Sequence, residues 1–185
     1  MDRRILKTRD SIKTAYMDLI ITKKNHKITI AELSREANID RKTFYLHYNS
    51  LDDVMTTIIQ EHLLEFEQYI NKDHLLQNTI DANIIMHAMN LCVMKHIDFY
   101  QAVVNHLGFE PIAKQMKEIL AQKALETHSD SSTLSERDVK IYCNFLLSGI
   151  IAVYTDWFQN NSSITLEELE KLTSNVLHNG IQVLT

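Results

Sequence analysis

The side chains best suited to chemistry lie close together, between positions 41 and 48. Arg41 and Lys42 can each donate hydrogen bonds to O6 and N7 of guanine, the commonest specific contact between a protein and DNA. Thr43 can bond to a base edge or touch a thymine methyl group. Three further side chains can donate to phosphate oxygens: Tyr45, His47 and Tyr48. This combination in one short stretch indicates a surface that recognises nucleic acid.

Two helix-start signals and a turn flank this stretch and must position it. Thr29 and Glu32 have the spacing of a capping box, which predicts a helix of about nine residues. Asn38 tolerates the left-handed conformation that a tight turn between helices requires. Asp40 is a favourable N-cap for a second helix over 41–48. The order predicts a helix-turn-helix, whose second helix enters the major groove with its N-terminal residues against base edges.

Residues 28–54 resemble the DNA-binding domain of TetR-type transcriptional regulators, and with the preceding apolar helix the resemblance covers about residues 4–57. The aromatic pattern from Phe44 to Tyr48 is similar to the recognition-helix signature of that family. Segments 145–149 and 157–158 are similar to a C-terminal subclass that includes regulators linked to dihydroxyacetone kinase operons.

The resemblance implies a role for each side chain in the motif. The residues expected to face bases are Arg41, Lys42 and Thr43. The residues expected to face the DNA backbone are Thr29, Tyr45 and His47. Tyr48 joins them on its own chemistry, because its ring can pack inward while its hydroxyl meets a phosphate. The chain departs from the family pattern at Asn38, where Gly is usual, and at Leu51, where a phosphate-binding Lys is usual. Asn suits the turn, whereas Leu51 removes one backbone contact.

Composition points to an all-α fold of about nine helices. The 185 residues include 3 Gly and 1 Pro, too few for the turns of an all-β protein. No G-x-G-x-x-G or G-K-[ST] motif is present, which excludes the two common nucleotide-binding loops. Apolar periodicity and capping signals predict helices at roughly 4–22, 29–37, 41–48, 51–71, 81–95, 98–107, 111–127, 135–159 and 165–184.

Charge divides the chain unevenly. Residues 1–50 hold 11 Lys and Arg against 6 Asp and Glu, whereas residues 51–185 hold 8 against 18. A cationic first quarter attracts polyanions, although a chance asymmetry of solvated helix faces would look the same. We expect a DNA-binding domain over 1–50, with the start of a connecting helix at 51–71, and an effector-binding and dimerisation domain over 72–185.

The helix expected at 135–159 is apolar nearly all round, so it must be covered on two sides. One side can face the protein's own core and the other a second copy, because small side chains permit close helix approach. The expected interface residues are Ile141, Phe145, Ser148, Gly149, Ala152, Leu169, Leu172 and Val176. The alternative is a central helix in a monomer.

A Met- and aromatic-rich region suggests where a small-molecule effector would bind. It contains Met86, Met89, Phe99 and Tyr100, and the resemblance implies an inducer pocket enclosed by the middle helices, although such a stripe is also typical of plain core. Cys92 and His96 have the i, i+4 spacing of metal ligands, but no third ligand follows at helical spacing. We therefore expect no metal and no cofactor.

The predicted function follows from these features. There is no signal peptide, and the apolar stretches are judged too short and too polar to span a bilayer, so we expect a cytoplasmic protein with no membrane contact. No carboxylate cluster and no Ser or Cys with a paired His is readable, so an enzyme is not expected. The prediction is a bacterial, homodimeric, ligand-responsive regulator, a repressor by default, that binds a pseudo-palindromic DNA operator. The alternative is a coactivator, or an effector- or protein-binding module whose DNA binding is weak or vestigial.

Overall fold

The computed structural model describes residues 3–23, 27–74, 82–107, 110, 112–114, 117–118, 121–122, 125, 135–160 and 163–179 of the chain. Within these residues the backbone is helical and no strand occurs. The helices are α1 (Arg3–Thr22), α2 (Ile30–Glu36), α3 (Arg41–His47), α4 (Leu51–His74), α5 (Ala82–Lys95), α6 (Ile97–Leu107), α8 (Glu136–Gln159) and α9 (Leu166–Asn179). The predicted all-α fold is confirmed.

Most helix ends lie close to the positions expected from capping residues and periodicity. The largest difference among the described ends is at α4, which continues to His74 rather than ending near 71. Most of the helix expected at 111–127 lies outside the described residues, although 112–114, 117–118 and 121–122 are helical. The expected end of the last helix, 180–184, also lies outside them.

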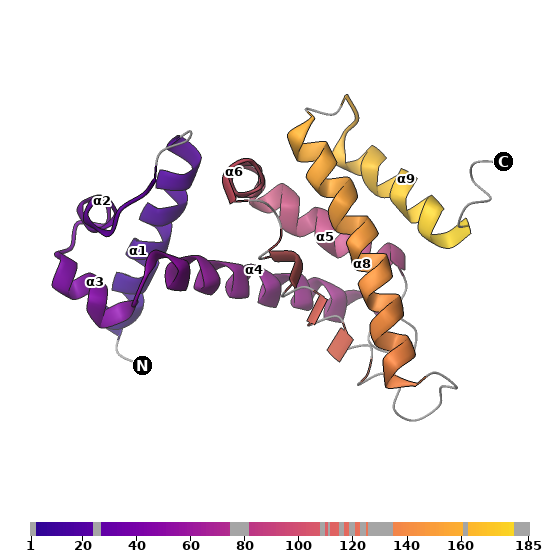
Figure 1. The fold of residues 1–185 in the computed structure, drawn as a ribbon, viewed down its shortest axis with the longest axis horizontal. Coiled ribbons are helices and arrows are strands. Elements are labelled where there is room, and N and C mark those ends of the chain that lie inside the picture. The colour runs from indigo at the N-terminus through magenta and orange to yellow at the C-terminus, as the bar shows by residue number, and fades with distance from the viewer. Residues whose placement is uncertain are drawn as a thin grey trace.

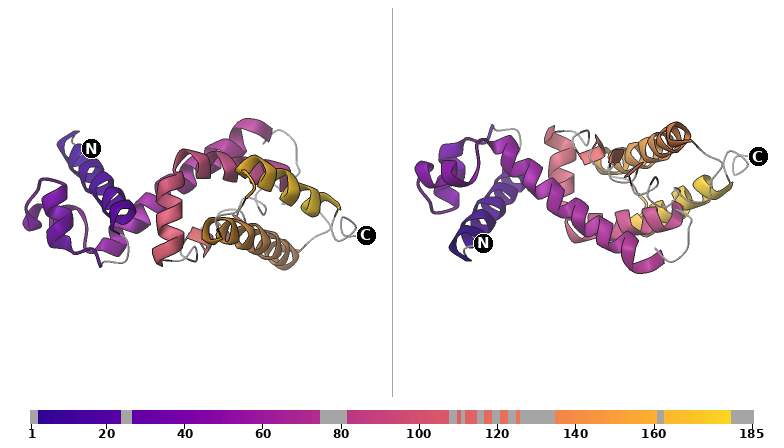
Figure 2. Two further views of the ribbon diagram at one scale, coloured as in Figure 1. Left: turned by 90° about the horizontal axis from the view of Figure 1, so that it is seen from above. Right: turned by 90° about the horizontal axis from the view of Figure 1, so that it is seen from below.

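The helices form an elongated molecule (Figure 1). Helices α1, α2 and α3 lie together at one end, and α4 runs from that end toward α5, α8 and α9. Two further views show the same elongation, with α6 crossing the middle (Figure 2). Because α6 packs against both α1 and α8, it joins the first three helices to the rest of the chain.

Buried apolar side chains form one continuous cluster along the molecule. Ile12 of α1 and Phe44 of α3 are fully buried at one end, and Tyr154 of α8 is fully buried at the other. Ile58 and Phe66 of α4 lie between them in the same cluster. Helix α4 therefore carries the core from one end of the protein to the other.

A buried polar network fixes α5, α8 and α9 against one another. The Tyr154 hydroxyl of α8 donates to Asn90 Oδ1 of α5. Asn90 Nδ2 in turn donates to the Leu166 carbonyl, at 2.8 Å, and to Glu170 Oε2, at 2.5 Å, both in α9. His87 Nδ1 lies 3.1 Å from Glu170 Oε1. Since buried polar groups are costly when unpaired, these bonds specify one arrangement of the three helices.

Helix α8 has an unusual composition for a helix that is only partly covered. It is long and apolar enough to cross a membrane by length and composition, contrary to our expectation, and no other helix in the described part of the chain meets that test. Only 22% of its most apolar window is buried inside the chain. A core helix of a soluble protein can have the same length and composition.

Candidate nucleic-acid interface

Helix α2 begins with the capping box expected from the sequence. The Thr29 hydroxyl accepts a hydrogen bond from the Glu32 amide at 3.3 Å, and the Thr29 amide donates to Glu32 Oε2 at 3.1 Å. Lys23 also donates to this carboxylate. The Lys23 ammonium, together with the Thr29 amide, lowers the pKa of Glu32. The start of α2 is thus held by its own capping box and by Lys23, which follows the last residue of α1.

The turn between α2 and α3 depends on one residue with a left-handed backbone. Asn38 has a φ of 54°, the sole positive value found at a non-glycine residue in the described chain. The amides that follow α2 are bonded back to it, Asn38 to the Arg35 carbonyl and Ile39 to the Ser34 carbonyl. Asn therefore serves where the family usually has Gly, as the sequence predicts.

Helix α3 is capped at its start and anchored at its centre. Asp40 Oδ1 accepts a hydrogen bond from the Thr43 amide at 2.7 Å, and this bond lowers the pKa of Asp40. Phe44 is fully buried, and the centre of its ring lies 5.4 Å from that of Tyr45 and 6.2 Å from that of Tyr48. Because α3 has only seven residues, these two attachments determine which of its side chains face outward.

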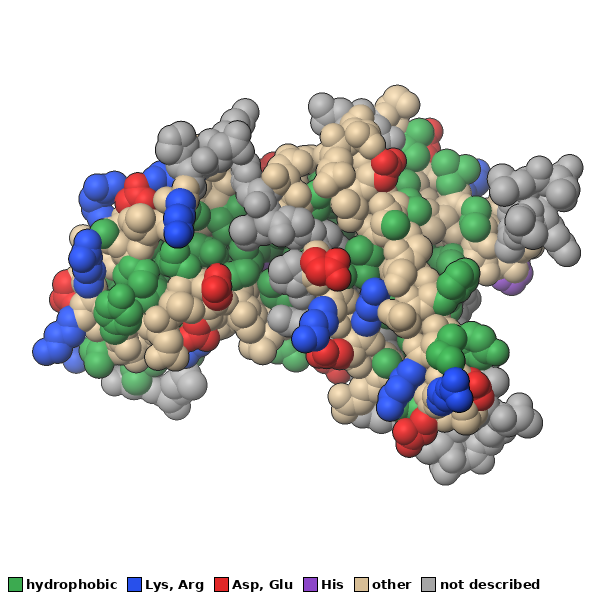
Figure 3. Space-filling view, viewed as in Figure 1, with side chains coloured by type: hydrophobic (Ala, Val, Ile, Leu, Met, Phe, Trp, Pro, Cys, Tyr) green, Lys and Arg blue, Asp and Glu red, His purple; other side chains and the backbone are tan. Residues whose placement is uncertain are grey.

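The structure leaves most of the predicted DNA-binding side chains accessible. Arg41 and Lys42 are exposed at the start of α3, and Tyr45 is 57% exposed. Thr29 is exposed at the start of α2, whereas Thr43 and His47 are half-buried. Figure 3 shows Lys and Arg side chains around the end of the molecule formed by α1, α2 and α3.

Tyr48 departs from its predicted role. Its side chain is 2% exposed, and its hydroxyl is buried with no hydrogen-bond partner among the described residues. The Arg9 guanidinium of α1 lies over the ring, 4.6 Å from its centre, and burial raises the pKa of the hydroxyl. In this conformation Tyr48 packs α3 against α1 and cannot reach a phosphate.

Leu51, at the first position of α4, packs against the hydrophobic core and is half-buried. The amide of Asp53 in the same turn bonds to Ser50 Oγ at 3.1 Å, so the helix start is capped. The family's Lys would point to a phosphate from this position. Here the residue contributes packing instead.

The sequence interpretation missed Leu46. It is 74% exposed, the largest exposed fraction among the apolar side chains of α3. The signal was present, because Leu46 stands two residues after the buried Phe44 and therefore on the opposite side of a helix. Leu46 has no hydrogen-bonding group, so a search for polar donors to DNA does not select it.

A family model of the C-terminal region of TetR-type transcriptional regulators matches residues 80–179, more than half of the chain. The chain belongs to the TetR family of transcriptional regulators. Proteins of this family are regulators rather than enzymes, and they bind DNA and often ligands as dimers.

Individual relatives agree with this assignment. The HTH-type transcriptional regulator YxbF of Bacillus subtilis (strain 168), whose name calls it uncharacterised, is 34% identical over 71 residues. These are 38% of this chain and 19% of YxbF, so the match spans about a fifth of that relative's length.

Solved structures of low sequence identity have the same fold. The dihydroxyacetone kinase operon activator DhaS is 21% identical, with a TM-score of 0.63 over 95% of this chain and 97% of DhaS. The fatty acid degradation regulator FadR from Bacillus halodurans is 18% identical, with a TM-score of 0.70 over 95% and 96% of the two chains. At such identities the likeness establishes the fold alone.

This TetR-family chain exposes an apolar face on α8 and α9, where green side chains are visible in Figure 3. Phe145 is 77% exposed, and a Cβ added at Gly149 would have no described atom within 4 Å beyond the adjoining residues and backbone of its own helix. The other predicted interface residues that are exposed here are Ile141, Ser148, Ala152, Leu172 and Val176. Leu169 is the exception, because it is 6% exposed and belongs to the chain's own core.

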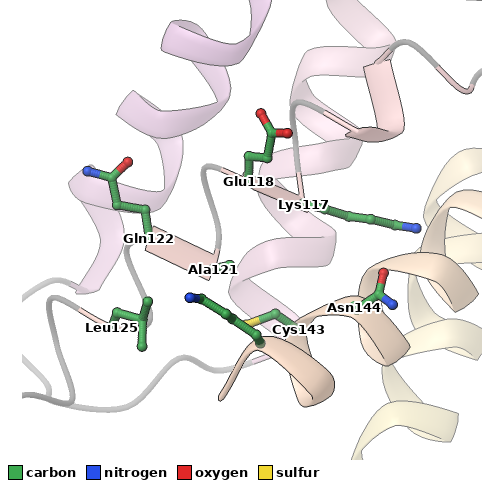
Figure 4. A pocket seen from close by; sticks show the side chains of 8 residues that line it. Lys117, Glu118, Ala121, Gln122, Leu125, Cys143 and Asn144 are labelled. Atoms are coloured by element: carbon green, nitrogen blue, oxygen red, sulfur yellow. The ribbon is translucent and has the colours of Figure 1, made fainter. Parts of the chain in front are cut away.

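The four residues predicted to contact an effector are buried core residues: Met86, Met89, Phe99 and Tyr100. A separate open pocket of about 390 Å³ lies between residues 117–118, 121–122 and 125 on one side and α8 on the other (Figure 4). Lys117, Leu125 and Cys143 are among its lining residues, and none of the four predicted residues is.

A second buried polar cluster joins α4 to the corner between α5 and α6. His62 stacks on His96 with ring centres 4.0 Å apart, and it meets Phe99 edge to face at 5.1 Å. Burial lowers the pKa of His62 to about 4. Glu65 accepts hydrogen bonds from Lys95 and from the Tyr69 hydroxyl, and it lies 3.0 Å from His96 Nε2. Hydrogen bonds to its carboxylate lower the pKa of Glu65 to about 2 despite the opposing effect of burial.

The pair Cys92 and His96 does not extend to a third metal ligand among the described residues. Cys92 is buried, and burial raises the pKa of its thiol to about 12. His96 is engaged with Glu65 and His62.

Proposed function

We propose that this regulator binds a specific double-stranded DNA operator through α3. The observation that carries the proposal is the capped helix-turn-helix, in which Phe44 anchors α3 from within and leaves Arg41 and Lys42 exposed. A recognition helix held by its inner face presents its outer face to the major groove.

The exposed side chains divide into two roles. Arg41, Lys42 and Thr43 meet base edges, and these contacts specify the sequence. Thr29, Tyr45 and His47 meet the DNA backbone, and these contacts set position. Tyr48 supports the helix from behind, since its hydroxyl is buried.

The active species is a homodimer joined through the apolar face of α8 and α9. The exposed Phe145 and the open space at Gly149 support this assignment, because a second copy of α8 could approach closely there. Contact with protein also accounts for a helix as apolar as α8 without a membrane. Two-fold symmetry presents two recognition helices to a pseudo-palindromic site, with half-sites about 34–36 Å apart.

The chain divides by function into a DNA-binding domain over 1–50, continued by the connecting helix, and an effector-binding and dimerisation domain over 72–185. A small molecule bound in the second domain favours one of two conformations and so changes operator affinity. The pocket lined by Lys117, Leu125 and Cys143 is the first place to seek such a ligand. The contact of α6 with α1 offers a route to the DNA-binding end.

The regulator acts in the cytoplasm, and repression is its default effect. Activation is the alternative, and the structurally similar DhaS carries the name of an operon activator. A reporter gene placed behind the operator distinguishes the two effects, because the regulator lowers its expression if it represses and raises it if it activates.

The test is enrichment of duplexes from a random-sequence pool with the purified full chain, followed by mobility-shift titration of the recovered duplex at several salt concentrations. We expect one pseudo-palindromic sequence to be enriched and its affinity to fall steeply with salt. Failure to shift any duplex even in dilute buffer would contradict the proposal.

A protein-binding or effector-binding module with weak DNA affinity is the second candidate. Leu51 favours it, because the residue packs inward where a phosphate-binding Lys is usual. Leu51→Lys should then raise the affinity for all duplexes alike. It should also steepen the slope of log affinity against log salt concentration by about 1, as expected for one added phosphate contact.

A further inference from the structure

We propose that Leu46 is a specificity-determining residue that contacts the methyl group of a thymine in each half-site. The proposal rests on the DNA-binding function proposed above and adds a base preference to it. It is carried by the direction of Leu46, its neighbours on α3 and the chemistry of the major groove.

The direction of Leu46 follows from the residues that anchor α3. Phe44 and Tyr48 are 0% and 2% exposed, so they define the inner side of the helix. At about 100° per residue, Leu46 lies midway between them in sequence and on the opposite side of the helix. Its exposed fraction of 74% agrees with that position. Leu46 is therefore more exposed than Tyr45 and His47, the residues at its flanks.

The neighbours of Leu46 place it on the face proposed to enter the groove. Lys42 is four residues earlier and lies one turn away on the same face, and it is exposed. Tyr45, at the flank, is also exposed. The described contacts of α3 are with α1 and α2, which hold its other side. No described helix covers Leu46.

The chemistry of the groove selects thymine. Each base pair offers hydrogen-bonding groups at its major-groove edge, but the prominent apolar group there is the C5-methyl of thymine. A leucine side chain can make no hydrogen bond, so its favourable partner is that methyl. One turn of helix rises about 5–6 Å, so the thymine should lie within about two base pairs of the base that Lys42 contacts.

The test compares thymine with deoxyuridine, which lacks only the methyl group. Duplexes are first enriched from a random pool with the wild-type full chain and, separately, with Leu46→Ala. The wild-type duplex is then synthesised with deoxyuridine at each conserved thymine in turn, and dissociation constants are measured for both proteins. Burying one methyl group corresponds to about a fourfold change in affinity per half-site.

We expect one thymine per half-site at which deoxyuridine weakens wild-type binding about fourfold and leaves Leu46→Ala nearly unaffected. Leu46→Met, which keeps an apolar side chain, should retain the sensitivity. Leu64→Ala provides the matched control, because Leu64 is 57% exposed on α4 and should not alter any base preference.

Two results would overturn the proposal. Sensitivity to deoxyuridine that is absent in the wild type, or equal in wild type and Leu46→Ala, would exclude a methyl contact by Leu46 while leaving DNA binding itself intact. Absence of any enriched duplex with the wild type would overturn the proposed function and this inference together. The wild-type measurement needs no variant, so a folding defect in Leu46→Ala cannot obscure it.

Discussion

Single residues determine which side of α3 meets the solvent. Asp40 fixes the first turn through the Thr43 amide, and Phe44 fixes the inner face by full burial. Arg41 and Lys42 are exposed at the start of the helix. Their substitution should therefore change DNA recognition more than folding stability.

Arg41→Ala and Lys42→Ala test this separation of tasks. Each should cost about 1–3 kcal/mol of binding free energy at one base position and relax specificity there. The measurement is competition binding against operator duplexes with single base changes. Equal weakening on every duplex would mean that the cation meets only phosphate.

His62 gives the fold a specific response to acid. Burial lowers its pKa to about 4 in the folded state, against about 6.5 in an unfolded chain. As the pH falls from 6.5 toward 4, the unfolded state binds a proton that the folded state excludes, so stability present above pH 6.5 is lost. We expect the free energy of unfolding to drop by about 2 kcal/mol between pH 7 and pH 5 through this group.

Denaturant titrations of the wild type and His62→Phe at both pH values check this expectation. Phe offers an aromatic ring to Phe99 and to the His96 ring without a titrating nitrogen. The variant should lose less stability over this interval. An identical loss in both proteins would assign the acid sensitivity to other groups.

At the scale of elements, helix starts were predictable and helix orientation was not. The caps at Thr29 and Asp40 were readable because a short polar side chain and its partner lie within four residues. Leu169 was expected at an interface and the Tyr48 hydroxyl at the DNA backbone, yet both side chains are buried. Which side of a helix is covered depends on packing between distant segments, and the periodicity of one helix does not supply it.

The network around Asn90 should be the most sensitive link among α5, α8 and α9. Tyr154→Phe removes the hydroxyl that donates to Asn90 Oδ1 within the core. Loss of a buried hydrogen-bond partner should cost about 1–3 kcal/mol of stability. Denaturant unfolding measures the change.

Tyr142→Phe is the matched control for this substitution, because Tyr142 lies on the same helix but is 54% exposed. Its loss of a hydroxyl should change stability by less than about 0.5 kcal/mol. Equal effects of the two substitutions would show that the network contributes nothing specific.

At the scale of the whole molecule, the two ends have different surfaces. Basic side chains surround α1, α2 and α3 and are present again at the start of α8, where Arg137 and Lys140 are exposed; exposed apolar side chains such as Phe145 and Leu172 lie on α8 and α9 (Figure 3). The charge counts of the sequence anticipated the first surface. The composition of α8 predicted an apolar face on this helix. Which residues belong to that face depends on which side chains α5 and α6 cover.

Phe145→Glu should convert a dimer into a monomer. Phe145 is 77% exposed within one chain, so a charge there is harmless to the isolated fold but costly inside an apolar interface. Light scattering coupled to size-exclusion chromatography should report half the wild-type mass, and operator affinity should fall. Leu64→Glu, on the exposed side of α4, should leave the mass unchanged.

The empty space beside Gly149 allows a single methyl group to act in opposite directions. Within one chain the added carbon would meet no described atom within 4 Å beyond the adjoining residues and backbone of its own helix, and exchanging a glycine for alanine in a helix interior is worth about 1 kcal/mol. Gly149→Ala should therefore raise the stability of the isolated subunit. It should also weaken the dimer, because the added methyl group would separate the two copies of α8. If Gly149→Ala raises the melting temperature of the subunit and weakens its self-association, Gly149 lies at the contact between the two copies.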